Sequence, residues 1–413
     1  MNNSNRFSLF FLLLLFVDCT NAEDVAPLFP CTDKLQEAYG VNCHLTFHQD
    51  YSRRDAELAL MNRIGVNCVR GGAHFFALGF GDGGFHPHMM DSVLMSVKKT
   101  GVVMHGNLSI DAFGKKCWEN MEGYARYVDY LSDRYNGEIF NWEVINEVDL
   151  TFKTDQAAKK YANLLKRIYP VFKKDGRNNN VLISGLAQVR TPFLDSLCMY
   201  NAYRFFDIMN IHTYDQPEKL YQHFYALREV MDKYGWEKEV WLGECGMHTA
   251  PDTTKANQWS NRDWLIAEQA RRLPRIYLIA FAYGINKVYW YETRAEEKNP
   301  YDMEHHFGLL HADLTPKPAY YAYKTLIEKC PDKSTRPKLK IVGENYLASW
   351  VTPKGKKVWA AWSLAHSPLN IKTGKKAQYY DLYGKKIKDP IKLGPSVIYI
   401  ENIKDVLLVP RNY

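Results

Sequence analysis

Cysteine is sparse in this chain and never clustered. Eight cysteines are spread over 413 residues, and no two form a CxxC pair or stand beside a group of histidines. Structural zinc sites use such closely spaced ligands. We therefore predict no metal centre and no cofactor. Cys43, Cys68 and Cys245 lie in apolar segments, which indicates small buried hydrophobic residues.

Long hydrophobic runs are also missing. The one apolar run, residues 7–17, is shorter than the ~20 residues that span a bilayer, follows an arginine and precedes Thr20-Asn21-Ala22. This pattern is typical of a signal peptide cleaved near Ala22. We predict an exported protein (secreted, periplasmic or at the cell surface) with no integral membrane segment after cleavage. A lipidated Cys19 is an alternative, but the preceding Asp18 argues against it.

The chain lacks tandem repeats, low-complexity tracts and nucleic-acid-binding motifs. Its positive charge is confined to one end: residues 331–413 hold 16 Lys and Arg against 6 Asp and Glu, while the whole chain has a net charge of +7. These lysines are scattered among short alternating strands and match no nucleic-acid motif. We expect a solvated face and no nucleic-acid partner, and the sequence does not indicate the oligomeric state.

Short apolar segments alternate with amphipathic helical patterns from about residue 39. A (β/α)8 TIM barrel of ~250 residues is the expected result. An open doubly wound sheet competes with it, but no Gly-rich phosphate loop follows the first strand. The predicted strands are 41–47, 67–72, 102–108, 139–147, 181–185, 208–214, 240–244 and 287–292.

The pattern of residues changes after Cys330. Short alternating segments are separated there by Pro-Lys-Gly, Thr-Gly and Tyr-Gly turns, which indicates a small all-β, sandwich-like domain. We predict three parts: a signal peptide over residues 1–22, an α/β catalytic barrel over 23–335 and a C-terminal β domain over 336–413.

Polar residues stand where the predicted barrel strands end. Because the active site of such a barrel lies at the C-terminal ends of its strands, these side chains should gather at one mouth. Two opposed carboxylates there suit glycoside hydrolysis, in which one protonates the leaving oxygen and the other attacks the anomeric carbon. The strand-end residues are Arg70, Asn146, Glu147, His212, Tyr214, Glu244 and Trp290.

Asn146-Glu147 near the end of the fourth strand, with Glu244 in WLGECG at the end of the seventh, resembles the clan A retaining glycoside hydrolases. Residues 305–323 resemble the end of the barrel in family 39-like and family 5-like members. The resemblance implies that Glu147 is the acid/base and Glu244 the nucleophile. WEVINEVD departs from the more usual Asn-Glu-Pro, and Cys245 stands where an aromatic residue is frequent.

The same resemblance assigns supporting roles in substrate binding. Asn146 would bind the sugar 2-hydroxyl, Arg70 and Tyr214 would orient Glu244, and Trp290 would lie under the sugar. His212 falls at a substrate-contacting position. The implied function is a secreted retaining glycosidase acting on a β-linked oligo- or polysaccharide.

Several alternatives stay open. Glu143 lies within the predicted strand, where a supporting ion pair is favoured over catalysis, and Asp149 should lie in the following loop. His74 and His105 can be interpreted as core or loop residues without a catalytic role. A catalytically inactive barrel serving as a carbohydrate-binding or surface-interaction protein is the rival function. The sugar, the linkage, endo or exo action and the family are not determined.

Overall fold

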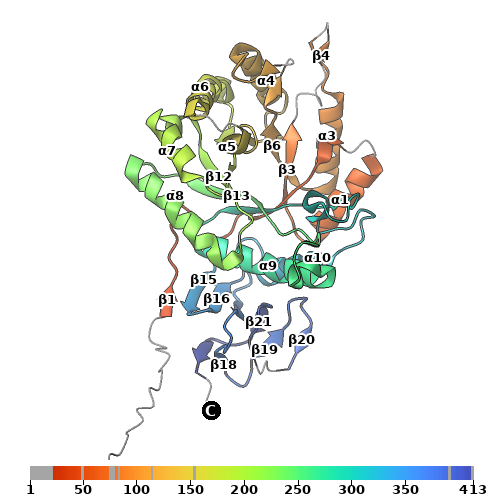
Figure 1. The fold of residues 1–413 in the computed structure, drawn as a ribbon, viewed down its shortest axis with the longest axis vertical. Coiled ribbons are helices and arrows are strands. Elements are labelled where there is room, and N and C mark those ends of the chain that lie inside the picture. The colour runs from red at the N-terminus through yellow and green to blue at the C-terminus, as the bar shows by residue number, and fades with distance from the viewer. Residues whose placement is uncertain are drawn as a thin grey trace, which may run out of the picture.

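A computed structural model of the chain describes residues 22–410 apart from 48–50, 74–79, 82–83, 113–114, 152–154 and 389–391 (Figure 1). Cys19, most of the predicted signal peptide and His74 lie outside the described residues. Within them, every helix is too short or too polar for a membrane crossing. The seven described cysteines are free thiols, and Cys43, Cys68 and Cys245 are buried as expected.

Eight parallel strands form a closed barrel, as predicted. Neighbouring strands pair in chain order, and a bridge between Leu182 and Ile208 links the fifth strand to the sixth. A two-residue strand, β11 (Leu186–Ala187), continues the fifth position beside the sixth. The eight strands are β2 (Tyr39–Asn42), β3 (Cys68–Ala73), β6 (Val103–Leu108), β9 (Asn141–Glu143), β10 (Asn180–Leu182), β12 (Ile208–His212), β13 (Glu239–Cys245) and β14 (Lys287–Trp290).

Helices surround the barrel (Figure 1). The longer ones are α1 (Tyr51–Arg63), α3 (His88–Thr100), α4 (Met121–Arg134), α6 (Asp155–Phe172), α7 (Thr191–Met199), α8 (Leu220–Tyr234), α9 (Arg262–Ala282) and α10 (Pro318–Lys329). Short elements lie in the connections: α5 (Val148–Thr151), the 3-10 turns 45–47, 174–176, 202–205, 217–219, 258–260 and 303–306, and the small hairpins β4 (Phe80–Gly81) with β5 (Gly84–Phe85) and β7 (Asp111–Ala112) with β8 (Lys115–Lys116).

Local sequence signals explain several helix ends. The Asn120 side chain accepts a hydrogen bond from the Gly123 amide and starts α4, and Asn261 caps α9 in the same way. An N-cap side chain satisfies amides that have no partner within the helix. Gly235 ends α8 in the left-handed conformation that glycine adopts without steric cost.

The lower barrel interior is closed by apolar side chains, and the polar residues lie above them. Cys68, Leu182, Ile208, Trp241 and Tyr289 form this plug, and all are buried. A Cβ atom at Gly40 would lie 2.3 Å from the Tyr289 ring, so a side chain there would displace the plug. The packed interior leaves the C-terminal mouth as the place for chemistry.

The fourth strand is shorter than the prediction of 139–147. It ends at Glu143, and Ile145 and Glu147 have φ values of 69° and 42°. Positive φ is incompatible with an extended strand and uncommon for residues other than glycine. Glu147 therefore stands in the turn between β9 and α5 rather than on the strand.

The C-terminal residues form the predicted β domain. A seven-stranded sheet has the order β1-β15-β16-β17-β21-β19-β20, and β18 with β22 form a second, two-stranded sheet. The strands are β15 (Lys338–Val342), β16 (Asn345–Val351), β17 (Lys357–Ser363), β18 (Asn370–Lys372), β19 (Gln378–Tyr380), β20 (Lys386–Ile387), β21 (Ile398–Glu401) and β22 (Leu407–Val409).

The first described strand belongs to this C-terminal sheet. β1 (Ala22–Asp24) pairs antiparallel with β15, Ala22 opposite Val342. Residues 23 and 24, which the sequence places in the barrel part, therefore pair with the C-terminal sheet. An edge strand finds its partner through backbone hydrogen bonds, which three residues of sequence do not reveal.

The β domain packs directly on the barrel helices. Tyr346 and Trp362 stack with ring centres 5.1 Å apart, and Trp362 Nε1 donates to Glu218 Oε1 at 3.1 Å. Trp350 Nε1 donates to the Lys329 carbonyl at the end of α10. These side chains join one buried cluster with the barrel core. The two parts thus share a hydrophobic core.

Candidate active site

Arg70 on β3 is the centre of the site. Its Nε and Nη2 bind the two carboxylate oxygens of Glu143 at 2.5 and 3.0 Å, and its Nη1 donates to Glu244 Oε1 at 2.7 Å. The same guanidinium donates to the side-chain oxygens of Asn42 and Asn146 at 2.7 and 2.6 Å. A planar donor fork can fix several acceptors at once. Arg70 therefore ties together residues from β2, β3, β9 and β13 and from the turn after β9.

Glu143 is the fully buried carboxylate of the site. Its Oε1 also accepts a hydrogen bond from the Gly185 amide at 3.0 Å. Burial raises the pKa of a carboxyl group, but the charge and hydrogen bonds of Arg70 outweigh it and lower the pKa of Glu143 to about 2. Glu143 is thus a permanent counter-charge for Arg70, as the sequence interpretation favoured.

Glu147 reaches into the mouth from the turn before α5. Its Oε1 lies 3.0 Å from His212 Nδ1, and its side chain is 21% exposed. His212, at the end of β12, is buried between three carboxylates, with Glu244 Oε2 at 3.5 Å and Glu143 Oε1 at 4.0 Å. Glu147 is the most accessible carboxyl group of this cluster, so it can exchange protons with a bound molecule or with water.

Glu244 lies near the end of β13 with its two oxygens held differently. Oε1 accepts from Arg70, and Oε2 accepts from the Tyr214 hydroxyl at 2.6 Å. Burial raises its pKa, but His212, Arg70 and the Tyr214 hydrogen bond outweigh burial and lower it below the usual value. Glu244 is therefore held as a carboxylate, the form that a nucleophile requires.

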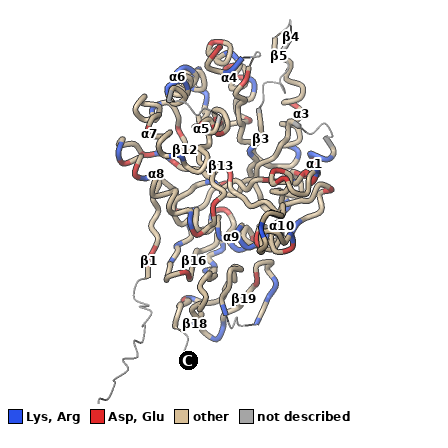
Figure 2. Tube along the Cα trace, viewed as in Figure 1, with Lys and Arg blue, Asp and Glu red and all other residues tan. Residues whose placement is uncertain are grey.

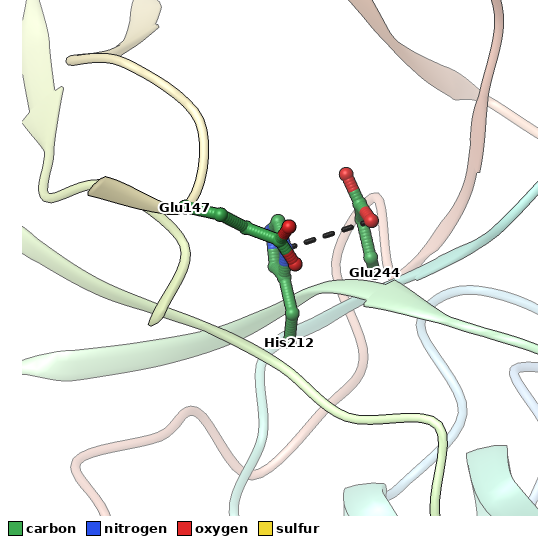
Figure 3. A group of neighbouring side chains, drawn as sticks. All are labelled: Glu147, His212 and Glu244. Atoms are coloured by element: carbon green, nitrogen blue, oxygen red, sulfur yellow. Dashed lines mark hydrogen bonds and ion pairs between the residues drawn. The ribbon is translucent and has the colours of Figure 1, made fainter. Parts of the chain in front are cut away.

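Glu147 and Glu244 face the same space beside His212 (Figure 3). One ligand atom from each of these three side chains lies within 4.8 Å of the others. This is close to the ~5 Å between the carboxyl groups of retaining glycosidases, and shorter than the ~6.5 Å or more of inverting ones. Carboxylate oxygens and an imidazole nitrogen are also metal ligands. Among the described residues, this is the group that could hold an ion.

A cavity of about 750 Å³ opens over the two glutamates. Such a volume suits a bound small molecule or one or two sugar rings. Arg70, Asn146, Glu147, His212, Tyr214 and Glu244, six of the seven predicted site residues, line it. Further lining residues that argue for a sugar site are the aromatic Tyr291, Trp259 and Phe307 and the polar His44, Gln188 and Arg190.

Trp290 does not take the predicted position, and this prediction needs correction. Its side chain is fully buried in the core cluster and does not line the cavity. Side chains alternate along a strand. Tyr289 faces the barrel plug, so Trp290 points outward to the helices and Tyr291 returns to the mouth. Tyr291 packs edge-on against Tyr214 there, with ring centres 6.1 Å apart.

Two other contacts were not anticipated. Asn42 on β2 accepts from Arg70 and donates to the Gly243 carbonyl, so it links the arginine to β13. The sequence signal that could have identified Asn42 is its position as a polar residue within an apolar strand. Asp149 lies in α5 rather than a loop, and its Oδ1 accepts from the Ala187 amide. Asp149 therefore braces the turn that carries Glu147.

His105 is buried below the site and lies 3.6 Å from Glu143. Burial lowers its pKa to about 3, so it remains neutral. Its ring contacts those of Trp241 and Tyr289 in the barrel plug. These contacts agree with its structural interpretation.

No protein-family model and no curated protein sequence matches the chain. Solved structures do match. A family 39 glycoside hydrolase from the gut symbiont Bacteroides cellulosilyticus WH2 is 19% identical, with a TM-score of 0.71 over 92% of this chain and 83% of that one. A monomeric beta-xylosidase from Caulobacter crescentus CB15 is 14% identical, with a TM-score of 0.63 over 92% and 97%. A GH30 endoxylanase from Clostridium papyrosolvens C71 is 11% identical, with a TM-score of 0.60 over 92% and 100%. The chain has the fold of these clan A glycoside hydrolases, a (β/α)8 barrel with an attached β domain.

Proposed function

We propose that the protein is a retaining β-glycosidase. The observation that carries this proposal is the pair Glu147 and Glu244, which share the barrel mouth with carboxyl oxygens within 4.8 Å. Their environments differ: Glu244 is buried between Arg70 and Tyr214, whereas Glu147 is partly exposed beside His212. Two carboxyl groups in unlike environments can divide the acid and nucleophile roles.

The reaction proceeds by double displacement. Protonated Glu147 gives its proton to the glycosidic oxygen while Glu244 attacks the anomeric carbon, so the leaving group departs as an alcohol and a glycosyl-Glu244 ester forms. Glu147, now a carboxylate, takes a proton from water, and that water displaces Glu244. The sugar is released with its original configuration.

Other residues position these groups. Arg70 and Tyr214 each donate a hydrogen bond to one oxygen of Glu244. These two bonds hold the carboxylate in a fixed orientation for attack on the anomeric carbon. The side-chain oxygen of Asn146 accepts a hydrogen bond from Arg70, so its NH₂ group can donate to a sugar hydroxyl. Tyr291 provides the aromatic ring that Trp290 was expected to supply. The substrate class that this supports is a β-linked neutral oligo- or polysaccharide.

Single substitutions test the two roles. We expect Glu244→Ala to lower kcat by about 10⁴-fold on aryl β-glycosides. Glu147→Ala should lose activity by about 10²–10⁴-fold with poor leaving groups and much less with good ones, because a good leaving group needs no proton. Glu328→Gln is the matched control, because this exposed carboxyl group on α10 pairs with Lys324 and does not line the cavity.

Four outcomes would count against the proposal. Equal losses for Glu147→Ala on both leaving groups would remove its acid role, and full activity of Glu244→Ala would remove the nucleophile. Wild type that binds glycans but cleaves none would favour the inactive carbohydrate-binding barrel. Activity abolished by a chelator and restored by a divalent cation would instead assign Glu147, His212 and Glu244 to a metal ion.

Export is part of the proposed function. The apolar run of residues 7–17 and the Thr20-Asn21-Ala22 segment support a signal peptide, and a secreted enzyme would meet polysaccharide outside the cell. N-terminal sequencing of protein recovered from the exporting cell tests this. A mature chain that starts near residue 23 is expected, whereas an intact Met1 start in a cytoplasmic fraction would contradict it.

A further inference from the structure

A second hollow lies in the C-terminal domain, away from the catalytic cavity. Its volume is about 620 Å³, and it shares no lining residue with the cavity at the barrel mouth. It lies at the β19–β20 end of the seven-stranded sheet, where Tyr380 pairs with Lys386. Its lining consists of Thr373, Gly374, Lys375, Lys376, Ala377, Gln378, Tyr379, Lys386, Ile387 and Lys388.

Four of the ten lining residues are lysines, and none is acidic. Lys375, Lys376, Lys386 and Lys388 are all exposed. Over the described part of the chain, no carboxylate forms an ion pair with any of them, whereas Lys329 and Lys356 of the same region pair with Glu401 at 2.9 and 2.5 Å. Figure 2 shows Lys and Arg along this end of the domain. Among the described residues, the lysines of the hollow therefore form a concentration of positive charge without an acidic partner.

Like charges held close together repel each other, and a bound anion relieves that repulsion. The hollow also contains two neutral hydrogen-bonding groups beside the lysines: the Thr373 hydroxyl, which bonds the Tyr379 hydroxyl, and the Gln378 amide, whose oxygen accepts from Tyr380 and whose NH₂ group is a donor. Four lysines with an amide and a hydroxyl beside them match a chain that carries both acidic groups and hydroxyls. We propose that this hollow binds an acidic polysaccharide through its carboxylate or sulfate groups.

Two other kinds of polyanion fit the hollow less well. Single-stranded nucleic acid is bound by exposed aromatic rings on which bases stack, but Tyr379, the aromatic residue of the hollow, is buried at 6% exposure. Peripheral membrane binding combines basic residues with exposed apolar side chains. None of the hollow's lining residues is among the exposed large hydrophobic residues of the described chain.

The position of the hollow gives binding there a distinct consequence. The β domain shares its core with the barrel, so a glycan held at β19–β20 keeps the catalytic mouth at a fixed orientation and a restricted distance from the same material. Where the acidic groups of the polymer are interspersed with neutral β-linked sugars, holding enzyme and polymer together raises the effective concentration of those sugars at the mouth without changing the catalytic groups. The site would therefore affect action on a polymer and leave small substrates unaffected.

Binding of the full chain to defined polymers tests the proposal. The probes are polygalacturonate, dextran sulfate, neutral dextran, single-stranded DNA and phosphatidylserine vesicles, each measured by titration calorimetry at low and high salt. The variant is Lys376→Glu/Lys386→Glu, and the matched control is Lys354→Glu/Lys404→Glu, which makes the same charge change at exposed lysines of the domain outside the hollow.

We expect the wild-type protein to bind polygalacturonate or dextran sulfate, with an affinity that falls as salt screens the charges. It should not bind neutral dextran. The hollow variant should bind at least about tenfold more weakly, whereas the control should stay within about twofold of wild type. The stronger of the two acidic probes identifies the carboxylate or the sulfate as the preferred group. Thermal unfolding of both variants checks that the fold is retained.

Four outcomes would overturn the proposal: no wild-type binding to either acidic polymer, equal weakening in the control variant, equal binding of neutral dextran, or tighter binding to DNA or phosphatidylserine vesicles than to the acidic polysaccharides. Because these readouts do not involve the barrel mouth, the proposal stands or falls independently of glycosidase activity.

Discussion

Three glutamates lie around Arg70 and His212, and their surroundings give them three different properties. Glu143 is fully buried and accepts two hydrogen bonds from Arg70, Glu244 accepts one hydrogen bond from Arg70 and one from Tyr214, and Glu147 is partly exposed beside His212. The same carboxyl group is thus a fixed counter-charge, a held anion or an accessible acid according to its neighbours.

Tyr214→Phe should move the acid limb of the kcat/KM profile to higher pH. The Tyr214 hydroxyl stabilises the charged form of Glu244 and so lowers its pKa. Removing that donor raises the pKa, and Glu244 then becomes protonated, and inactive as a nucleophile, at a higher pH. A pH–rate profile on an aryl glycoside measures this. An unchanged acid limb with a uniformly lower rate would mean that Tyr214 acts on substrate binding alone.

Glu143→Gln should destabilise the fold in a pH-dependent way. Breaking a buried ion pair costs about 3–5 kcal/mol. The pKa of Glu143 is lowered to about 2 in the fold, below the ~4.3 of an unfolded glutamate, so its stabilisation is complete above the unfolded pKa and lost as pH falls toward 2. Urea unfolding at pH 7 and pH 3 should show the gap to wild type narrowing on acidification.

The control for this measurement is Glu122→Gln, whose ion pair with Arg167 is on the surface and should change stability little. If the Glu143 variant lost the same stability at both pH values, its effect would come from packing rather than from charge.

Most residues of this site could be predicted from the sequence, because polar residues at the ends of apolar strands are easily recognised there. Glu147, Glu244, Arg70, His212 and Tyr214 do meet at the mouth. Trp290 was assigned wrongly, since a one-residue step along a strand moves a side chain to the other face. Only the three-dimensional register distinguishes it from Tyr291.

At the scale of the elements, the strands carry the site and the turns adjust it. Alternating apolar segments predicted all eight barrel strands, whose positions follow from burial. Their ends were less predictable. The turn after β9 contains Ile145 and Glu147 at positive φ, a conformation that neither residue type signals in sequence. Tertiary contacts, such as Asp149 with the Ala187 amide, stabilise that turn instead.

Gly185, between β10 and β11, should be intolerant of a side chain. A Cβ atom there would lie 1.9 Å from His212 Nε2, so alanine must displace the imidazole that contacts Glu147. We expect Gly185→Ala to lower kcat by about 10²-fold, because small misplacements of catalytic groups are costly. Gly394→Ala, where a Cβ would meet nothing within 4 Å, should be fully active. Wild-type kcat in Gly185→Ala would show that His212 does not position the acid.

At the scale of the whole molecule, the barrel and the β domain share one buried hydrophobic cluster. The alternating segments and turn residues after Cys330 predicted the second domain. They did not show that its sheet buries Tyr346, Trp350 and Trp362 against the barrel helices. Nor did they show that residues 22–24 join that sheet. Both depend on long-range pairing, which local sequence does not encode.

Trp362→Ala should therefore destabilise the barrel as well as the β domain. Truncating a fully buried tryptophan costs about 3–5 kcal/mol, and Trp362 also loses its bond to Glu218. We expect one lowered unfolding transition, coincident when followed by calorimetry and by loss of activity. Leu407→Ala, at a residue 57% exposed, should leave the transition unchanged. A barrel that stays active above the transition of the β domain would contradict a shared core.

Trapping the glycosyl-enzyme tests the central claim most directly. The enzyme would be incubated with a 2-deoxy-2-fluoro glycoside of the sugar that it cleaves best as an aryl β-glycoside, digested and examined by mass spectrometry. The double-displacement account predicts one covalent sugar on the peptide that contains Glu244, and none on the peptide that contains Glu147. An adduct on another residue, or turnover to a product of inverted configuration without any adduct, would contradict it.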